Sequence, residues 1–88
     1  MTSLGNETAA RAVSVATTAE DLVVRLSDGR TITVPLSWYP RLFNATPEQR
    51  ERYRVIGDGE YIHWPEIDED LTVAGLLRGV RAPQKRAG

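Results

Sequence analysis

Two Asp-Gly pairs, Asp28-Gly29 and Asp58-Gly59, each lie between stretches in which apolar and polar residues alternate. An Asp-Gly pair in this setting is a strong signal for a tight turn between two antiparallel strands. Because side chains alternate between the two faces of a strand, the apolar pattern decides how each pair of strands is aligned. The two turns therefore constrain the fold more than any other feature.

The first turn requires a three-residue loop, Ser27 to Gly29. A two-residue turn would place apolar side chains on both faces of the sheet, whereas the longer loop leaves one face apolar. The pairs that this loop creates are Leu26 with Arg30, Val24 with Ile32, and Leu22 with Val34. Gly29 then supplies the positive φ of a bulge. A strand with Val13 and Val15 precedes this hairpin, which predicts a three-stranded meander.

The second turn fits a two-residue loop at Asp58-Gly59. It pairs Val55 with Ile62 and Tyr53 with Trp64 on one face of a second hairpin. The opposite face carries Ile56, Tyr61, Arg54 and His63. Because two of these residues are apolar, we expect that face to be partly covered.

Short helices are predicted around the second hairpin. Pro40 limits the segment 36–44 to one or two turns, whose side chains pack on the sheet. The residues expected to pack there are Leu36, Trp38, Leu42 and Phe43. Thr46, Pro47 and Gln49 form the pattern of a capping box, which predicts a helix to about Arg52.

A third helix is indicated near the end of the chain, with Thr72 as its cap and Gly79 as its stop. The predicted fold class is therefore α+β. It consists of a small antiparallel sheet, a three-stranded meander plus a second hairpin, with short helices packed against it. We expect the five strands to form one open sheet with two unpaired edges.

Length and composition support one domain at residues 11–80, between a flexible N-terminus (1–10) and a flexible basic tail (81–88). The 88 residues include no cysteine, which excludes a disulfide framework, a thiolate metal site and a cysteine nucleophile. The first residues lack a signal-peptide pattern, and no apolar run is long enough to span a bilayer. We therefore expect a cytoplasmic protein that has no membrane partner.

Several segments resemble one family of small bacterial proteins, the DUF2442 family, from about Val13 to Val80. They are Leu26-Ser27-Asp28-Gly29-Arg30, Trp38-Tyr39-Pro40-Arg41-Leu42, Ala45-Thr46-Pro47-Glu48-Gln49-Arg50, Ile62-His63-Trp64-Pro65-Glu66-Ile67-Asp68-Glu69-Asp70-Leu71 and Gly75-Leu76-Leu77. The resemblance implies a compact α+β domain whose molecular role is unassigned. Relatives occur alone, fused to a helix-turn-helix domain, or encoded beside small DUF4160 proteins in an arrangement that resembles a toxin–antitoxin pair.

Two segments are candidates for contact with a partner. Residues 63–70 gather an imidazole, an indole and four carboxylates, which suit a basic partner or a divalent cation. They also suit the positive end of the helix that follows. Trp38, Tyr39 and Arg41 form an aromatic turn of the residue types that dominate binding surfaces, and only one of the two adjacent aromatic rings can point into the core. The candidate partner-binding residues are Trp38, Tyr39, Arg41, His63, Trp64, Glu66, Asp68, Glu69 and Asp70.

The sequence favours a non-enzymatic protein-interaction domain that acts as the antitoxin-like member of a two-gene pair. Its expected partner is a small protein encoded beside it. No catalytic residue, cofactor or metal ligand is predicted, and the oligomeric state stays open. One alternative is a metal-dependent enzyme that uses Asp68, Glu69 and Asp70 with His63. Another is nucleic-acid binding through the basic tail, although the net charge of −1 makes a nucleic-acid partner less favoured.

Overall fold

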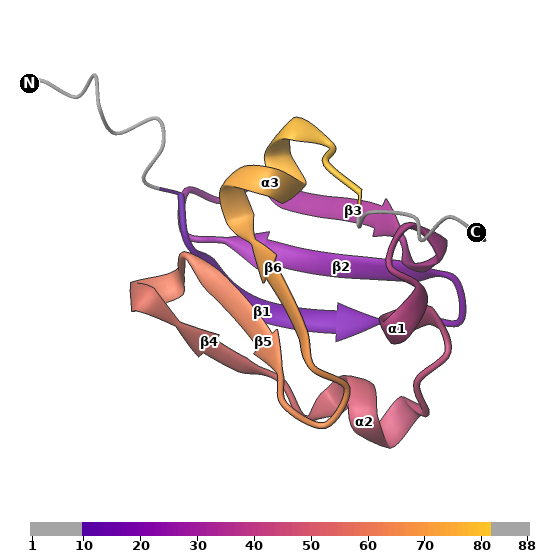
Figure 1. Cartoon of the computed structure of the whole chain (residues 1–88). Coiled ribbons are helices and arrows are strands. Elements are labelled where there is room, and N and C mark those ends of the chain that lie inside the picture. Colours follow the sequence, from indigo (N-terminus) through magenta and orange to yellow (C-terminus); the bar gives the residue numbers. More distant parts are fainter. Residues whose placement is uncertain (1–9, 82–88) are drawn as a thin grey trace, which may run out of the picture.

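Residues 10–81 are described by the computed structural model, and they form two antiparallel sheets and three short α-helices (Figure 1). The predicted flexible ends fall largely on residues 1–9 and 82–88, which lie outside the described residues. Ala10, at the border of the first of these segments, is buried in the core. No helix within residues 10–81 has the length and apolar character needed to cross a membrane.

The first three strands along the chain form one sheet, and the last three form the other. The first sheet contains β1 (Ala12–Thr17), β2 (Asp21–Leu26) and β3 (Thr31–Pro35). A 3-10 turn, η2 (Leu36–Trp38), follows the first sheet. Two short α-helices come next, α1 (Pro40–Phe43) and α2 (Pro47–Glu51). The second sheet contains β4 (Arg54–Ile56), β5 (Tyr61–Trp64) and β6 (Glu69–Thr72), with η3 (Gly57–Gly59) in its first turn and α3 (Val73–Arg78) after its last strand.

The predicted register of the first hairpin is confirmed. Strands β2 and β3 pair Val24 with Ile32 and Leu22 with Val34, and the N–H of Leu26 donates to the carbonyl of Arg30 at 2.8 Å. The predicted strand with Val13 and Val15 is present as β1 and completes the meander, but a bulge shifts its register between Ala12 and Ser14. One extra residue turns the following side chains to the other face, so Val13 is exposed while Ala12 and Val15 enter the core.

The second hairpin also has the predicted register. Val55 pairs with Ile62, and the N–H of Glu60 donates to the carbonyl of Gly57 at 3.1 Å across the two-residue turn. The expectation of one five-stranded sheet is wrong, because residues 69–72 form a further strand. Strand β6 pairs with β5 and completes a separate sheet in the order β4-β5-β6.

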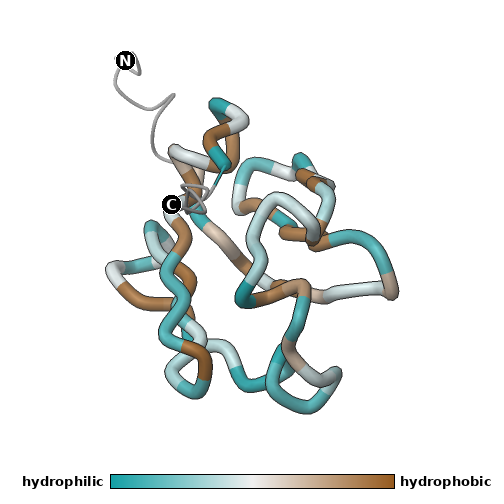
Figure 2. The backbone as a smooth tube through the Cα atoms, turned by 45° about the vertical axis from the view of Figure 1, so that its right-hand side comes forward, coloured by the Kyte–Doolittle hydropathy of each residue, from teal (hydrophilic) through white to brown (hydrophobic). Residues whose placement is uncertain are grey.

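One apolar core joins the inner faces of the two sheets. Figure 1 shows β6 crossing in front of the first sheet, and Figure 2 shows hydrophobic and hydrophilic stretches alternating along the chain, as one-sided burial requires. The largest fully buried side chains are Trp64, Tyr39, Leu22, Leu36, Leu42, Ile62 and Val24. The prediction that Phe43 packs on the sheet is wrong, since it lies at the end of the four-residue α1 and is 46% exposed.

The helix termini follow their sequence signals. Thr46 and Gln49 form the predicted capping box at α2, which ends at Glu51. The Thr72 hydroxyl accepts the N–H of Gly75 at the start of α3, and Gly79 ends that helix with a φ of 76°. These caps fix the direction in which α3 leaves β6.

Arg50 connects both central helices to the second sheet. Its guanidinium donates to the carbonyls of Leu42 and Phe43 at the end of α1, at 3.0 and 2.8 Å. The backbone carbonyl of Arg50 accepts the indole N–H of Trp64 at 3.0 Å. Arg50 therefore has a structural role, because it holds α1, α2 and β5 together.

The turn of the second hairpin lies against β1. The Arg11 guanidinium donates to the Asp58 carbonyl at 2.9 Å and to its carboxylate at 3.1 Å. Gly59 is buried in this contact, and a Cβ placed on it would lie 2.5 Å from the Cβ of Arg11 and 3.2 Å from the backbone of Ala12. Gly29 has a similar φ, 97° against 95°, but its Cβ position meets no atom within 4 Å.

Substitutions at Gly29 and Gly59 allow the contribution of the contact between the sheets to stability to be distinguished from the cost of backbone strain. Gly29→Ala should lower the free energy of unfolding by about 1–2 kcal/mol, the cost of a left-handed alanine. Gly59→Ala should lower the free energy of unfolding by about 1–3 kcal/mol more than Gly29→Ala does, because it also adds a methyl group where no space is available. Urea unfolding of the two variants measures the difference. Equal losses would show that the turn does not pack on β1.

Candidate functional site

The acidic segment is divided between two faces of a strand. The sequence suggested that the acids of residues 63–70 suit the positive end of the following helix, but Glu69 and Asp70 instead begin the strand β6. This strand forms because it pairs with β5, which supplies backbone partners that the local sequence does not reveal. Because side chains alternate along β6, Glu69 and Leu71 are buried while Asp70 and Thr72 are exposed.

Within residues 10–81, the outward side of the second sheet is exposed. We call it the outer face, and its residues are Arg54, Ile56, Tyr61, His63, Asp70 and Thr72. Ile56 and Tyr61 pair across the strands and are 44% and 43% exposed, so among the described residues the expected cover of this face is incomplete. Sequence reasoning found the residues of this face, but exposure depends on whether another element packs there, which the hairpin pattern does not specify.

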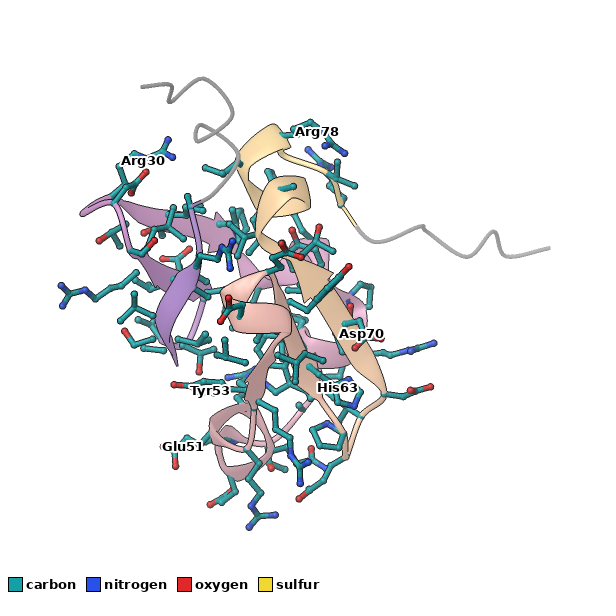
Figure 3. The ribbon with its side chains drawn as sticks, turned by 90° about the vertical axis from the view of Figure 1, so that its left-hand side faces the viewer. Arg30, Glu51, Tyr53, His63, Asp70 and Arg78 are labelled. Carbon is teal, nitrogen blue, oxygen red and sulfur yellow. The ribbon has the colours of Figure 1, made fainter. Side chains whose placement is uncertain are left out.

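His63 and Asp70 lie together on the outer face (Figure 3). They are cross-strand partners, and Nδ1 of His63 donates to the Asp70 carboxylate at 2.5 Å. Arg54 lies opposite His63 on the other side, as the predicted register requires. The structure therefore combines apolar and charged side chains on one sheet surface.

The exposed acids of the segment each have a basic neighbour. Glu66 forms an ion pair with Arg52 at 2.7 Å. The backbone carbonyl of Asp68 accepts a hydrogen bond from Arg41 at 2.5 Å, and its carboxylate lies 4.0 Å from the same guanidinium. The guanidinium groups of Arg52 and Arg41 therefore partly neutralise Glu66 and Asp68, while Asp70 is hydrogen-bonded to the His63 ring.

Glu69 differs from these acids in both burial and pairing. It is 8% exposed, and within residues 10–81 its carboxylate forms no hydrogen bond and no ion pair. Burial raises the pKa of the Glu69 carboxyl above its ordinary value, the nearby Arg41 opposes this effect, and Asp70 and Asp68 add to it. Glu69 is the one buried charged residue among the described residues.

A cavity of about 220 Å³ lies beside Glu69. Its other lining residues lie between η2 and α1, on β6, on α3 and in the segment after α3. They include Tyr39, Leu71, Leu76, Val80 and Arg81. The Tyr39 hydroxyl donates to the Val80 carbonyl at 3.0 Å. Burial raises the pKa of Tyr39, and the negative charge of Glu69 adds to the shift. The cavity thus combines apolar walls with one buried carboxylate.

The two aromatic residues of the predicted contact turn have different environments. Tyr39 is 1% exposed and belongs to the core, whereas Trp38 is half-buried, which confirms that only one of the rings points inward. The Arg81 guanidinium lies 4.7 Å above the Trp38 ring, within the range of a cation–π contact. Trp64 is also fully buried, so it can affect a partner only through the residues it supports, whereas Tyr39 can be reached from the cavity beside Glu69.

The carboxylates do not gather around a common point. Within residues 10–81 no group of three or more His, Asp or Glu side chains is arranged to hold a metal ion. Glu69 faces inward and Asp70 outward, so the arrangement that the metal-dependent alternative requires is not formed by these residues. The alternative of nucleic-acid binding depends on the basic tail, of which residues 82–88 lie outside the described residues.

The buried carboxylate makes stability depend on pH. Because the folded state raises the pKa of Glu69, the unfolded chain loses this proton first as pH rises, and the wild type loses stability between the ordinary glutamate pKa and the raised value. Glu69→Gln removes this loss. The variant should be at least as stable as the wild type at neutral pH, and its advantage should shrink toward pH 4 to 4.5.

Thermal unfolding across this pH range measures the effect, with Asp68→Asn as the matched control. Asp68 is an exposed neighbour with a φ of 56°, a backbone conformation that asparagine accepts. An advantage of Glu69→Gln that stays constant with pH, or that appears equally in the control, would contradict the burial of an ionised Glu69.

Comparisons with known proteins place this geometry in a family. The sequence profile of the family described as protein of unknown function (DUF2442) matches residues 12–82. A comparison with curated proteins finds no match.

Two solved structures have the same fold. A protein of unknown function from Rhodospirillum rubrum is 26% identical, with a TM-score of 0.74 over 85% of this chain and 93% of that chain. An uncharacterised protein from Chromobacterium violaceum is 24% identical, with a TM-score of 0.70 over 83% of this chain and 69% of that chain. From its sequence match over residues 12–82, the chain belongs to the DUF2442 family of proteins of unknown function.

Proposed function

We propose that this chain is a non-enzymatic protein-interaction domain, the antitoxin-like member of a bacterial two-gene pair, and that its partner is the small protein encoded beside it. The partner would bind the outer face and the adjoining acidic turn, residues 65–68. The single observation that carries the proposal is the exposed pair of Ile56 and Tyr61, which no described element covers.

The composition of the outer face supports binding of another protein. Burying Ile56 and Tyr61 under a partner would remove apolar surface from water, which is the main favourable contribution in protein association. Tyrosine is also enriched in binding hot spots. A sheet face with two adjacent apolar side chains at its centre is therefore a suitable contact surface.

The charges at the border of this face would determine which partner fits. Arg52 and Glu66 form an exposed ion pair, which contributes little to stability and can exchange for charges on a partner, and Asp70 is hydrogen-bonded to His63 beside it. Because Glu66, Asp68 and Asp70 all lie in this border, a partner with basic side chains would be attracted. Arg41 would take part through its contact with Asp68.

The experiment uses co-expression with the product of the adjacent gene, followed by affinity measurement of the purified complex. Ile56→Glu places a charge at the centre of the proposed contact and should weaken binding at least about tenfold. Val13→Glu is the matched control, because Val13 is 61% exposed on the first sheet. The control should bind like the wild type.

The two variants make the proposal falsifiable. Absence of a complex with the wild-type chain would contradict a partner encoded beside it. Equal weakening by Ile56→Glu and Val13→Glu would show that the contact is not centred on the outer face. Circular dichroism of both variants verifies that each retains the fold.

A further inference from the structure

The cavity beside Glu69 shares Asp70 and Thr72 with the outer face, and two of its features point to a ligand of its own. Its volume of about 220 Å³ leaves room for a group the size of one side chain, which is less than the roughly 300–1,000 Å³ of sites for larger ligands. Its lining includes Glu69, which is 8% exposed and whose carboxylate accepts no hydrogen bond within residues 10–81. No fully buried side-chain oxygen among these residues lacks a partner, so the carboxylate oxygens open into the cavity. A largely buried charge is ordinarily paired, and the nearby Arg41 forms no ion pair with this one, so the carboxylate is available to a counter-ion.

We propose that this cavity binds an alkylammonium group, with the Glu69 carboxylate as its counter-ion. The inference goes beyond the interaction through the outer face, because the cavity borders β6, α3 and the aromatic turn, whereas Ile56 and Tyr61 lie on β4 and β5. The source of the group is either a lysine side chain of another protein or a free aliphatic amine. Both sources share the chemistry that the cavity recognises.

The walls of the cavity suit the aliphatic part of such a ligand. Leu71, Leu76 and Val80 provide apolar contacts along which methylene groups can pack. The Tyr39 hydroxyl already donates to the Val80 carbonyl, so its oxygen can accept a hydrogen bond from the ammonium. Glu69 accepts a second one. An ammonium carries three donors on one compact atom and can therefore contact both oxygens at once.

The charges around Glu69 favour a cation. Asp68 and Asp70 are negative neighbours of Glu69, while Arg41 is a positive neighbour that donates to the Asp68 carbonyl. Arg81 lines the cavity with its guanidinium over the Trp38 ring, so the flat aromatic surface at this side is already occupied by a planar cation. The site that remains is the one beside the carboxylate, which suits a compact ammonium better than a second guanidinium.

The fold itself supplies part of the binding affinity. Forming a buried ion pair ordinarily requires removing both ions from water, which opposes association. Here Glu69 is already largely removed from water before a ligand arrives, so most of the remaining cost is the loss of water by the ammonium. Binding should weaken as the pH falls through the raised pKa of Glu69, because protonation removes the charge of the counter-ion.

The test titrates the full chain with two probes, N-acetyl-lysine methylamide and butane-1,4-diamine, and follows the amide NMR signals of residues 69–76. We expect saturable binding of at least one probe at millimolar concentration. Glu69→Gln should weaken binding at least about tenfold, the order expected when a buried charge loses its partner. Asp68→Asn removes a nearby exposed carboxylate that does not line the cavity, so it should weaken binding much less than Glu69→Gln does.

Each outcome decides the proposal. Binding of the lysine derivative alone identifies a protein side chain as the source, and binding of the diamine alone identifies a free amine. Absence of saturable binding of both probes would overturn the proposal, and so would binding that Glu69→Gln leaves unchanged. Ile56→Glu should bind the probes like the wild type, so failure of this inference is distinguishable from failure of the partner interaction.

Discussion

The fold depends on the close packing of two small sheets through their inner faces. Trp64 lies fully buried at this contact, and its indole N–H donates to the carbonyl of Arg50, whose guanidinium in turn holds the end of α1. A domain of this length buries little apolar surface for its size, so one shared core has to stabilise both sheets. An apolar side chain used inward for this core can meet another molecule only where it lines the cavity beside Glu69. What the chain presents to other molecules is therefore set by which residues the strand registers direct outward.

Much of the fold could be predicted because local turn chemistry and apolar periodicity specify the same registers. Gly29 and Gly59 take the positive φ values that their turns require, and Thr46, Thr72 and Gly79 act at the helix ends where their chemistry suggested. Strand β6 was not predictable in this way, because its sequence Glu69–Thr72 has few residues that favour strands and is ordered by pairing with β5. The exposure of Val13 was missed because a bulge leaves no clear pattern in one sequence.

The residue types of the candidate site could be predicted from the sequence, but which of these residues are exposed could not. The sequence indicated that residues 63–70 are rich in charge, yet only the alternation along β6 separates Asp70 on the outer face from Glu69 in the core. Ion pairs with Arg52 and Arg41 then neutralise part of the exposed acids, and these two partners come from outside the segment. The result is two distinct chemical environments within a few residues: an exposed sheet face suited to a protein, and a small cavity with a buried carboxylate.

Both environments rest on the register between β5 and β6, which a pair of engineered cysteines can measure directly. The chain contains no cysteine, and His63 faces Asp70 across the two strands. Facing Cα atoms in antiparallel strands lie about 4.5–5.5 Å apart, within the roughly 4.4–6.8 Å of a disulfide. The double variant His63→Cys with Asp70→Cys should therefore form an intramolecular disulfide under mild oxidation, while His63→Cys with Glu69→Cys should not. A disulfide in the second variant and none in the first would reverse the two faces of β6 and contradict the account.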